Sequence, residues 1–143
     1  MIIDLLYIFL GGLLSYLVDI STAPKDYYKK CIKKPEFHAK LLLHHIIVIL
    51  IFFGWLSNNK YILAIYLFVP IILITHWKTN NNRCAMTETV NDMCGLDKDE
   101  YIRDFIYLTG LKKTKYYDPL YNLFLLFTFI YVLYKLSRIK CFV

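Results

Sequence analysis

Residues 41–77 read LLLHHIIVILIFFGWLSNNKYILAIYLFVPIILITHW, which is two apolar runs separated by a short polar turn. A helix rises about 1.5 Å per residue, so runs 41–56 and 61–77 each have roughly the length that crosses a hydrocarbon core of about 30 Å. Because the turn at 57–60 is so short, the two helices must be antiparallel and touch. The stretch therefore predicts a transmembrane hairpin.

Two further apolar segments complete the predicted fold. Residues 2–20 are almost entirely apolar, and no basic residue precedes them, which favours a membrane helix over a cleaved signal peptide. Gly11 and Gly12 lack the GxxxG spacing and predict close helix packing. The last segment, 119–136, begins with a proline that suits the first turn of a helix. We therefore predict an all-α membrane bundle of four transmembrane helices, with residues 1–143 as one domain.

The composition supports this class. The chain has 143 residues, 58% of them hydrophobic, and its mean hydropathy is +0.45, which is too apolar for an ordinary soluble domain of this size. The formal net charge of +6 suggests nucleic acid, but in so apolar a chain charges that flank membrane spans explain it better. We therefore predict a lipid bilayer as partner and no nucleic acid.

The basic residues also predict an orientation. Lys and Arg number six in the connection 21–40 and seven in the loop 78–118, against four in the rest of the chain. The positive-inside rule places both loops in the cytoplasm and both termini on the opposite side. In the first loop, the residues expected to contact lipid headgroups are Lys25, Lys29, Lys30, Lys33 and Lys34.

The long loop predicts two short helices that cap the bundle or lie on the membrane surface. Thr87 is the expected cap of the first, which ends at Cys94-Gly95. Asp97 is the expected cap of the second, an amphipathic helix over 98–109 that Gly110 terminates. In that second helix, Phe105 and Ile106 are expected to be buried.

Most reactive side chains gather at the predicted cytoplasmic face. The candidate metal ligands are His44, His45, His76, Cys84 and Cys94, and a further polar cluster is Asp19, His38 and Asp118. Hydrogen-bonded packing or interfacial anchoring is the interpretation that we favour, because these groups lie only a turn or two from the interface. A metal or haem site and a proton or ion path stay open.

The histidine pair makes this expectation specific. Adjacent helix positions differ by about 100° in direction, so only one of His44 and His45 faces the bundle squarely. We expect polar contacts among that histidine, His76 and Asp19. The other histidine should turn toward headgroups or a different helix.

The sequence lacks the motifs that mark several specific chemistries. The sequence has no C-x-x-C pair, Gly-rich phosphate loop, G-x-S-x-G or HExxH motif. A disulfide between Cys84 and Cys94 is an option, but the predicted cytoplasmic placement favours free thiols. No cofactor is predicted, and an enzymatic role is not the expected one.

The loop carries one resemblance. His76-Trp77, Asn80-Asn81-Asn82 and Cys84-Ala85-Met86-Thr87 resemble the corresponding loop of small four-helix membrane proteins, some bacterial and others encoded by large DNA viruses. The bacterial ones carry a C-P-L-T-x-x-E phrase. This chain has Ala85 where the phrase has Pro and Val90 where it has Glu. No role of that glutamate can therefore be transferred to this chain. The resemblance implies no activity.

We expect a structural or assembly protein of a membrane, with a viral membrane as one candidate. Its partners would be the bilayer, acidic proteins or further copies of the chain. The first alternative is a membrane redox or metal/haem-binding protein that uses the histidine cluster. The second is a small ion or proton conductor.

Overall fold

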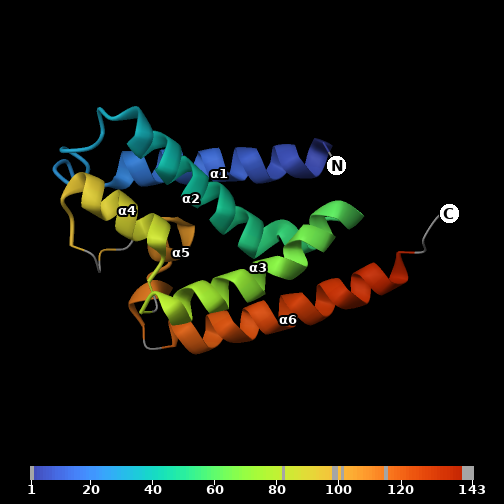
Figure 1. Ribbon diagram of the computed structural model, residues 1–143. Helices are drawn as coiled ribbons and strands as arrows, with labels where there is room; N and C mark the ends of the chain where they lie inside the picture. The colour runs from blue at the N-terminus through green and yellow to red at the C-terminus, as the bar shows by residue number, and fades with distance from the viewer. Residues whose placement is uncertain (1, 82, 98–99, 101, 115, 140–143) are drawn as a thin grey trace.

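The computed structural model describes residues 2–81, 83–97, 100, 102–114 and 116–139, apart from the side chains of Phe105 and Lys113. Within these residues the chain is helical and forms no strand (Figure 1). The long helices are α1 (Ile2–Thr22), α2 (Pro35–Phe53), α3 (Lys60–Thr79) and α6 (Tyr117–Arg138). The shorter elements are the 3-10 turns η1 (Gly54–Leu56) and η2 (Leu111–Lys113) and the helices α4 (Ala85–Cys94) and α5 (Phe105–Leu108).

The four long helices lie where the apolar segments predicted helices, and each is long and apolar enough to cross a membrane. The start of α2 is a correction, because residues 35–40 belong to the helix and not to the connection. Pro35 occupies the first turn of α2, where its missing N–H costs nothing and its fixed φ suits the helix. The pair Lys34-Pro35 therefore marks the start of α2.

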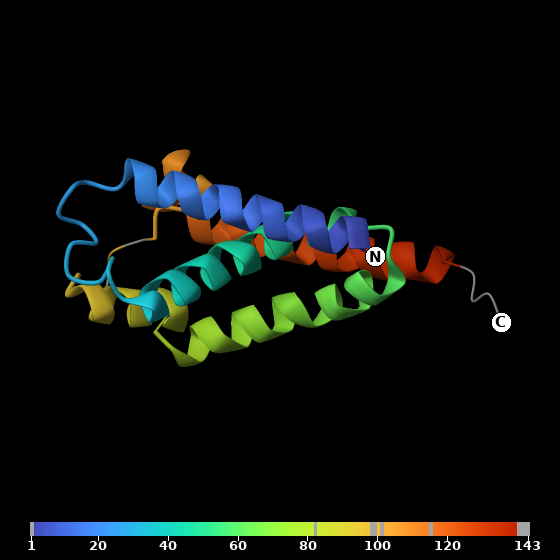
Figure 2. The same cartoon turned by 90° about the horizontal axis from the view of Figure 1, so that it is seen from above.

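The predicted central hairpin is present, because α2 and α3 are consecutive, antiparallel and in contact. Its two helices nevertheless have other main partners, since α2 packs mainly against α1, and α3 mainly against α6. The start of α1, the turn between η1 and α3, and the end of α6 lie at one end of the bundle (Figures 1 and 2). The 23–34 connection, α4 and α5 lie at the other end, called here the loop end.

Two glycines explain the close pairing of α1 with α2. A Cβ atom at Gly12 would lie 2.8 Å from Ile46 Cα, and one at Gly11 would lie 3.1 Å from Ile49 Cγ2. Backbone therefore meets backbone at Gly12, where no larger residue fits without movement. This confirms that the glycine pair serves helix packing.

A buried tyrosine ties the other helices together. The Tyr66 hydroxyl of α3 hydrogen-bonds to the Ile51 carbonyl of α2 at 2.7 Å and to Thr128 Oγ1 of α6 at 3.1 Å. Tyr66 has no exposed surface, so all of its polar capacity is used inside the bundle. The α2–α3–α6 core is thus held by a polar contact at its centre as well as by apolar packing.

In the long loop, α4 ends as predicted, because Gly95 adopts the left-handed conformation with φ of +68°. Its start is a correction, since Cys84 and not Thr87 occupies the N-cap position. Thr87 lies instead inside the first turn of α4.

The predicted helix over 98–109 is wrong. Among the described residues of that range, 100 and 102–109, only Phe105–Leu108 is helical. Asp104, not Asp97, is the N-cap, since its Oδ1 accepts from the amides of Ile106 at 3.1 Å and Tyr107 at 3.0 Å. The Asn91 side chain donates to the carbonyls of Asp97 at 3.0 Å and Glu100 at 2.8 Å. These bonds tie Asp97 and Glu100 to α4. Gly110 follows α5 as expected, and Ile106 is buried. The predicted burial of Phe105 concerns a side chain outside the described residues.

The outward faces of three long helices carry large apolar side chains. Soluble proteins rarely expose apolar patches of this extent. The exposed residues are Leu6, Leu10, Leu14 and Leu17 of α1, Ile65, Phe68 and Ile72 of α3, and Leu123, Leu126 and Ile130 of α6.

Candidate functional site

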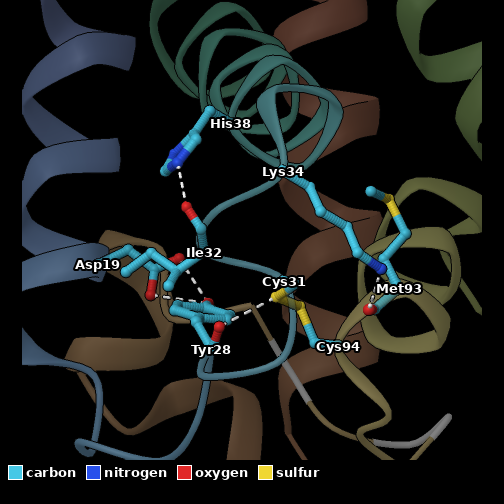
Figure 3. The surroundings of a disulfide bond; sticks show 8 residues. All are labelled: Asp19, Tyr28, Cys31, Ile32, Lys34, His38, Met93 and Cys94. Carbon is cyan, nitrogen blue, oxygen red and sulfur yellow. Dashed lines mark hydrogen bonds between the residues drawn. A yellow bond between two sulfur atoms is a disulfide. The ribbon is translucent and has the colours of Figure 1, made fainter.

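The loop end contains two adjoining clusters of buried polar side chains. The first is centred on Asp19, near the end of α1, which has no exposed surface. His45 Nε2 donates to Asp19 Oδ2 at 3.1 Å, and the Tyr28 hydroxyl donates to the same carboxylate at 3.0 Å (Figure 3 shows Tyr28 and Asp19). With its proton on Nε2, neutral His45 accepts at Nδ1 from the Ser15 hydroxyl at 2.9 Å. The predicted contact between Asp19 and one of the histidine pair is therefore confirmed, and it is His45 that makes it.

The spacing of polar residues along α1 is a sequence signal for this cluster. The buried residues of α1 are Ile8, Gly12, Ser15 and Asp19, which recur at spacings of three and four. This spacing places them on one helix face. The small and polar residues on that stripe mark the face that α2 covers.

His38 lies in the first turns of α2 and has a structural role. The Tyr16 hydroxyl donates to its Nδ1 at 2.6 Å, and its Nε2 donates to the Ile32 carbonyl at 2.6 Å. Figure 3 shows His38 above the connection that contains Ile32. Both ring nitrogens therefore tie α1 and the connection to α2.

The second cluster surrounds His44, whose ring lies edge to face against that of His45, with 5.7 Å between the ring centroids. His44 is 6% exposed, and its Nε2 lies 3.6 Å from Asp104 Oδ2, beyond ordinary hydrogen-bond length. Lys112 Nζ donates to the same Oδ2 at 2.6 Å. His44 also influences the pKa of the Cys84 thiol. His44 thus faces a different element from His45, as the geometry of adjacent helix positions requires.

The charges in this cluster shift two pKa values. Burial by itself raises the pKa of the Asp104 carboxyl. The contacts with His44 and Lys112 lower this pKa by a larger amount, so it lies below its usual value. Burial also raises the pKa of the Cys84 thiol, while His44 and Thr87 lower it more, to about 7. A thiol with this pKa is substantially ionised near neutrality, and the thiolate is the nucleophilic form of cysteine.

His76 lies close by but does not join either cluster. Its Nε2 accepts from the backbone amide of Ala85 at 3.1 Å and so fixes the start of α4 against the end of α3. No hydrogen bond or ion pair joins His76 to His44, His45 or Asp19 in the described part of the chain. The expected polar contacts therefore form without His76.

The cysteine pairing differs from both options considered. Cys31 and Cys94 form a disulfide with a Cα–Cα distance of 4.8 Å (Figure 3), and Cys84 has a free thiol. The disulfide joins the 23–34 connection to the end of α4, and its cysteines pack with Tyr28, Phe37 and Val90 in one apolar cluster. The expectation that Cys94 is a free thiol is therefore wrong. Spacing alone cannot single out Cys31, because tertiary folding brings the two segments together.

The candidate metal ligands are divided between different contacts. His45 binds Asp19, His76 binds the Ala85 amide, and Cys94 is in the disulfide, while His44 and Cys84 remain together. Over the described ranges, no group of three or more His, Cys, Asp or Glu side chains is arranged to hold a metal ion. Asp118 is exposed in the first turn of α6. Metal or haem binding stays an untested alternative.

Asp104 and Lys112 were not among the predicted site residues. Asp104 lies inside the range 98–109 that the apolar periodicity predicts as one helix, and this prediction hides its role as an N-cap. Asp at an N-cap position two residues before a buried Ile is an available signal. Its pairing with His44 depends on the tertiary structure.

No protein-family model, no curated protein and no solved structure matches this chain.

Proposed function

We propose that this chain is an integral membrane protein with a structural role, in which four helices anchor a rigid cationic surface at the membrane boundary. The single observation that carries the proposal is that the 23–34 connection, which contains five lysines, is held in a fixed position. The Cys31–Cys94 disulfide, the Tyr28–Asp19 hydrogen bond and the His38–Ile32 hydrogen bond tie that connection to α4, α1 and α2. A basic segment held in this way presents its charges without a large entropic cost of ordering.

The five lysines of this connection have different surroundings. Lys34 Nζ donates to the Met93 carbonyl at 3.5 Å, and the Lys30 side chain lies over Gly95, so both lie at the C-terminal end of α4 (Figure 3 shows Lys34). Positive charge at that end favours the helix dipole. Lys29 pairs with Asp26 at 3.2 Å, but both side chains are largely exposed, which makes the pair weak.

Lys25 and Lys33 remain for an outside partner. Both are exposed, and neither forms an ion pair within the residues that the structure describes. They follow the end of α1 and precede α2, and therefore lie at headgroup level if those helices span the bilayer. Each such lysine is attracted to an anionic leaflet by about 1 kcal/mol. Anionic lipid headgroups are therefore the proposed partner.

The lipid proposal is tested in nanodiscs made of either neutral or anionic lipid. We expect anionic lipid to raise the thermal midpoint of the wild-type protein, because a ligand that binds the folded state stabilises it. The double variant Lys25→Gln/Lys33→Gln should lose most of that increase. Lys60→Gln, at the opposite end of the bundle, is the matched control. An equal loss in the control, or no lipid dependence at all, would overturn the proposal.

The proposed orientation keeps the loop end in the cytoplasm, because the excess of Lys and Arg there is the strongest topological signal in the sequence. The disulfide argues for the opposite side, since disulfides persist mainly in oxidising compartments. Cys31 is 0% exposed and Cys94 3% exposed, so a reductant reaches the formed bond only after local opening. Burial thus makes a disulfide compatible with the cytoplasmic orientation.

A reporter inserted near Asn81 should be cytoplasmic, and one fused after Val143 should be on the other side. The reverse labelling would contradict the proposed orientation, but it would not contradict the proposal of lipid binding. The viral membrane, the redox protein and the ion conductor stay predictions. An absorption spectrum and a metal analysis of the purified protein separate the redox alternative from the rest.

A further inference from the structure

A small open hollow at the loop end has no part in the cationic surface described above. It has a volume of about 210 Å³ and lies between the start of α2 and the first half of α4, where it is lined by Lys40, Ala85, Met86 and Thr89. Figures 1 and 2 show α4 at the loop end beside the start of α2, and the two helices are in contact. Because a water-sized group occupies about 30 Å³, the hollow has room for about seven such groups, which is part of a lipid molecule and not a whole one.

The walls of the hollow are mainly apolar. Ala85 contributes a methyl group, and Met86 contributes a flexible thioether chain of the kind that adapts to irregular apolar groups. The Thr89 hydroxyl donates to the Ala85 carbonyl at 2.7 Å, so its proton is already used within α4. An apolar group can therefore enter the hollow without breaking a hydrogen bond of these walls.

Lys40 is the charged residue of the lining. It is half-buried, and in the described part of the chain it forms neither a hydrogen bond nor an ion pair, even with Glu36 one turn before it in α2. Glu88, the acid in the first turn of α4, accepts from the Asn80 side chain at 2.8 Å and lies 3.8 Å from Arg83. A half-buried ammonium group beside apolar walls is stabilised by an anionic partner. The hollow therefore suits a molecule that is both anionic and apolar.

Lys40 also lies at a suitable depth for a lipid. It is the sixth residue of α2 (Pro35–Phe53), so at about 1.5 Å per residue it lies about 8 Å along the helix from its start. Lysine side chains at such positions keep their carbon chain in apolar surroundings and extend the ammonium group toward the headgroups. Lys25 and Lys33 instead lie in the connection, outside both helices. If α2 spans the bilayer, the hollow is at the level where headgroups meet acyl chains.

We propose that this hollow binds one anionic phospholipid, with its phosphate at Lys40 and the ester end of one acyl chain against the apolar walls. The inference rests on the proposed function, because a bilayer lipid reaches the hollow only if the long helices span the membrane. It extends that function by naming a defined site for a single lipid, whereas Lys25 and Lys33 meet headgroups as part of an open surface. The unpaired charge of Lys40 favours an anionic lipid over a neutral one.

The experiment uses the full chain in phosphatidylcholine nanodiscs that contain a small fraction of phosphatidylglycerol with a diazirine near the ester end of one acyl chain. After illumination, peptide mapping should locate the label of the wild-type protein mainly within residues 85–89. Lys40→Gln should lower that label roughly fivefold, which corresponds to about 1 kcal/mol, while Lys40→Arg should keep most of it. Lys78→Gln, an exposed lysine at the same end that does not line the hollow, is the matched control and should be labelled like the wild type.

A second variant tests the walls without removing the charge. Ala85→Trp should fill the hollow and lower the label, and because Ala85 is exposed, the thermal midpoint in neutral nanodiscs should stay near that of the wild type. Excess glycerol 3-phosphate should not displace the lipid, since it lacks the acyl chain. Displacement by it would show that the hollow takes a soluble phosphate, and would overturn the lipid assignment. Unchanged labelling of Lys40→Gln, or equal labelling by a phosphatidylcholine that carries the same diazirine, would also overturn it.

The same samples separate this site from the cationic surface. Lys25→Gln/Lys33→Gln should lose most of the stabilisation by anionic lipid but keep the label within residues 85–89. A wild-type protein that anionic lipid stabilises, but that carries no label within 85–89, would overturn the site and leave the proposed function intact. A label within 85–89 that depends on Lys40, in a protein whose stability does not depend on Lys25 and Lys33, would support the site and contradict the cationic surface.

Discussion

The Nε2 atom of His45 lies 3.1 Å from Oδ2 of Asp19, and neither side chain has exposed surface. This contact joins α1 to α2 at the loop end. Tyr28 donates to the same carboxylate, so the connection between the two helices is held at the same point. A single carboxylate therefore organises three segments.

Replacing Asp19 by Ala should destabilise the bundle by about 3–5 kcal/mol, because the buried partners of the carboxylate lose their acceptor. Asp19→Asn should cost less, since it keeps one acceptor oxygen. Unfolding in mixed detergent micelles measures both. Asp26→Ala, at an exposed ion pair with Lys29, should have little effect and serves as the control. Equal losses for Asp19→Ala and Asp26→Ala would show that the buried contact contributes nothing.

Gly12→Ala should weaken the pairing of α1 with α2 more than Gly11→Ala. The new methyl group at Gly12 would meet the backbone of Ile46, whereas the one at Gly11 would meet only a side chain that can move. Alanine favours a helix by up to about 1 kcal/mol over glycine, so Gly11→Ala is expected to be nearly neutral. The thermal midpoints of the two variants provide the comparison. A more stable Gly12→Ala protein would contradict the close approach.

The loop end should loosen in acid because of Asp104. Its pKa in the folded protein lies below the ordinary 3.8, so its carboxylate stabilises the folded loop fully above that value. This contribution is lost as the pH falls through the lower, folded-state pKa. Asp104→Asn should therefore be less stable than wild type at pH 7, and the difference should narrow in acid. Limited proteolysis of the loop from pH 7 to pH 3 measures this, with exposed Asp92→Asn as the control. A difference that does not change with pH would exclude Asp104 as its source.

Reduction of the Cys31–Cys94 disulfide should lower the stability by about 2–4 kcal/mol, the usual effect of such a cross-link. Thiol labelling before and after reduction under denaturing conditions should reveal two additional thiols. The double variant Cys31→Ala/Cys94→Ala should not respond to reductant, while Cys84→Ala should respond like wild type. The same labelling in intact cells also reports whether the bond exists at the loop end in vivo. A wild-type protein without reductant-dependent thiols would show that the pair is not bonded.

The sequence alone predicted the elements whose signals are local. Apolar length marked α1, α2, α3 and α6, and Gly95 marked the end of α4, because helix formation and termination depend on residues within a turn or two. Part of the site followed as well. The angle between adjacent helix positions separated His44 from His45, and the depth of Asp19 along α1 placed it within reach of this pair.

The tertiary structure decided which elements and side chains meet. Asp104 rather than Asp97 caps a helix, and the Asn91 side chain binds the carbonyls of Asp97 and Glu100. Cys94 bonds to Cys31, and His44 meets both Asp104 and Cys84, across sequence separations that no local pattern encodes. The physical reason is that such pairs are selected by the packing of whole helices. That packing depends on side-chain shape at faces such as Gly11-Gly12, and many different pairings satisfy the same apolar periodicity.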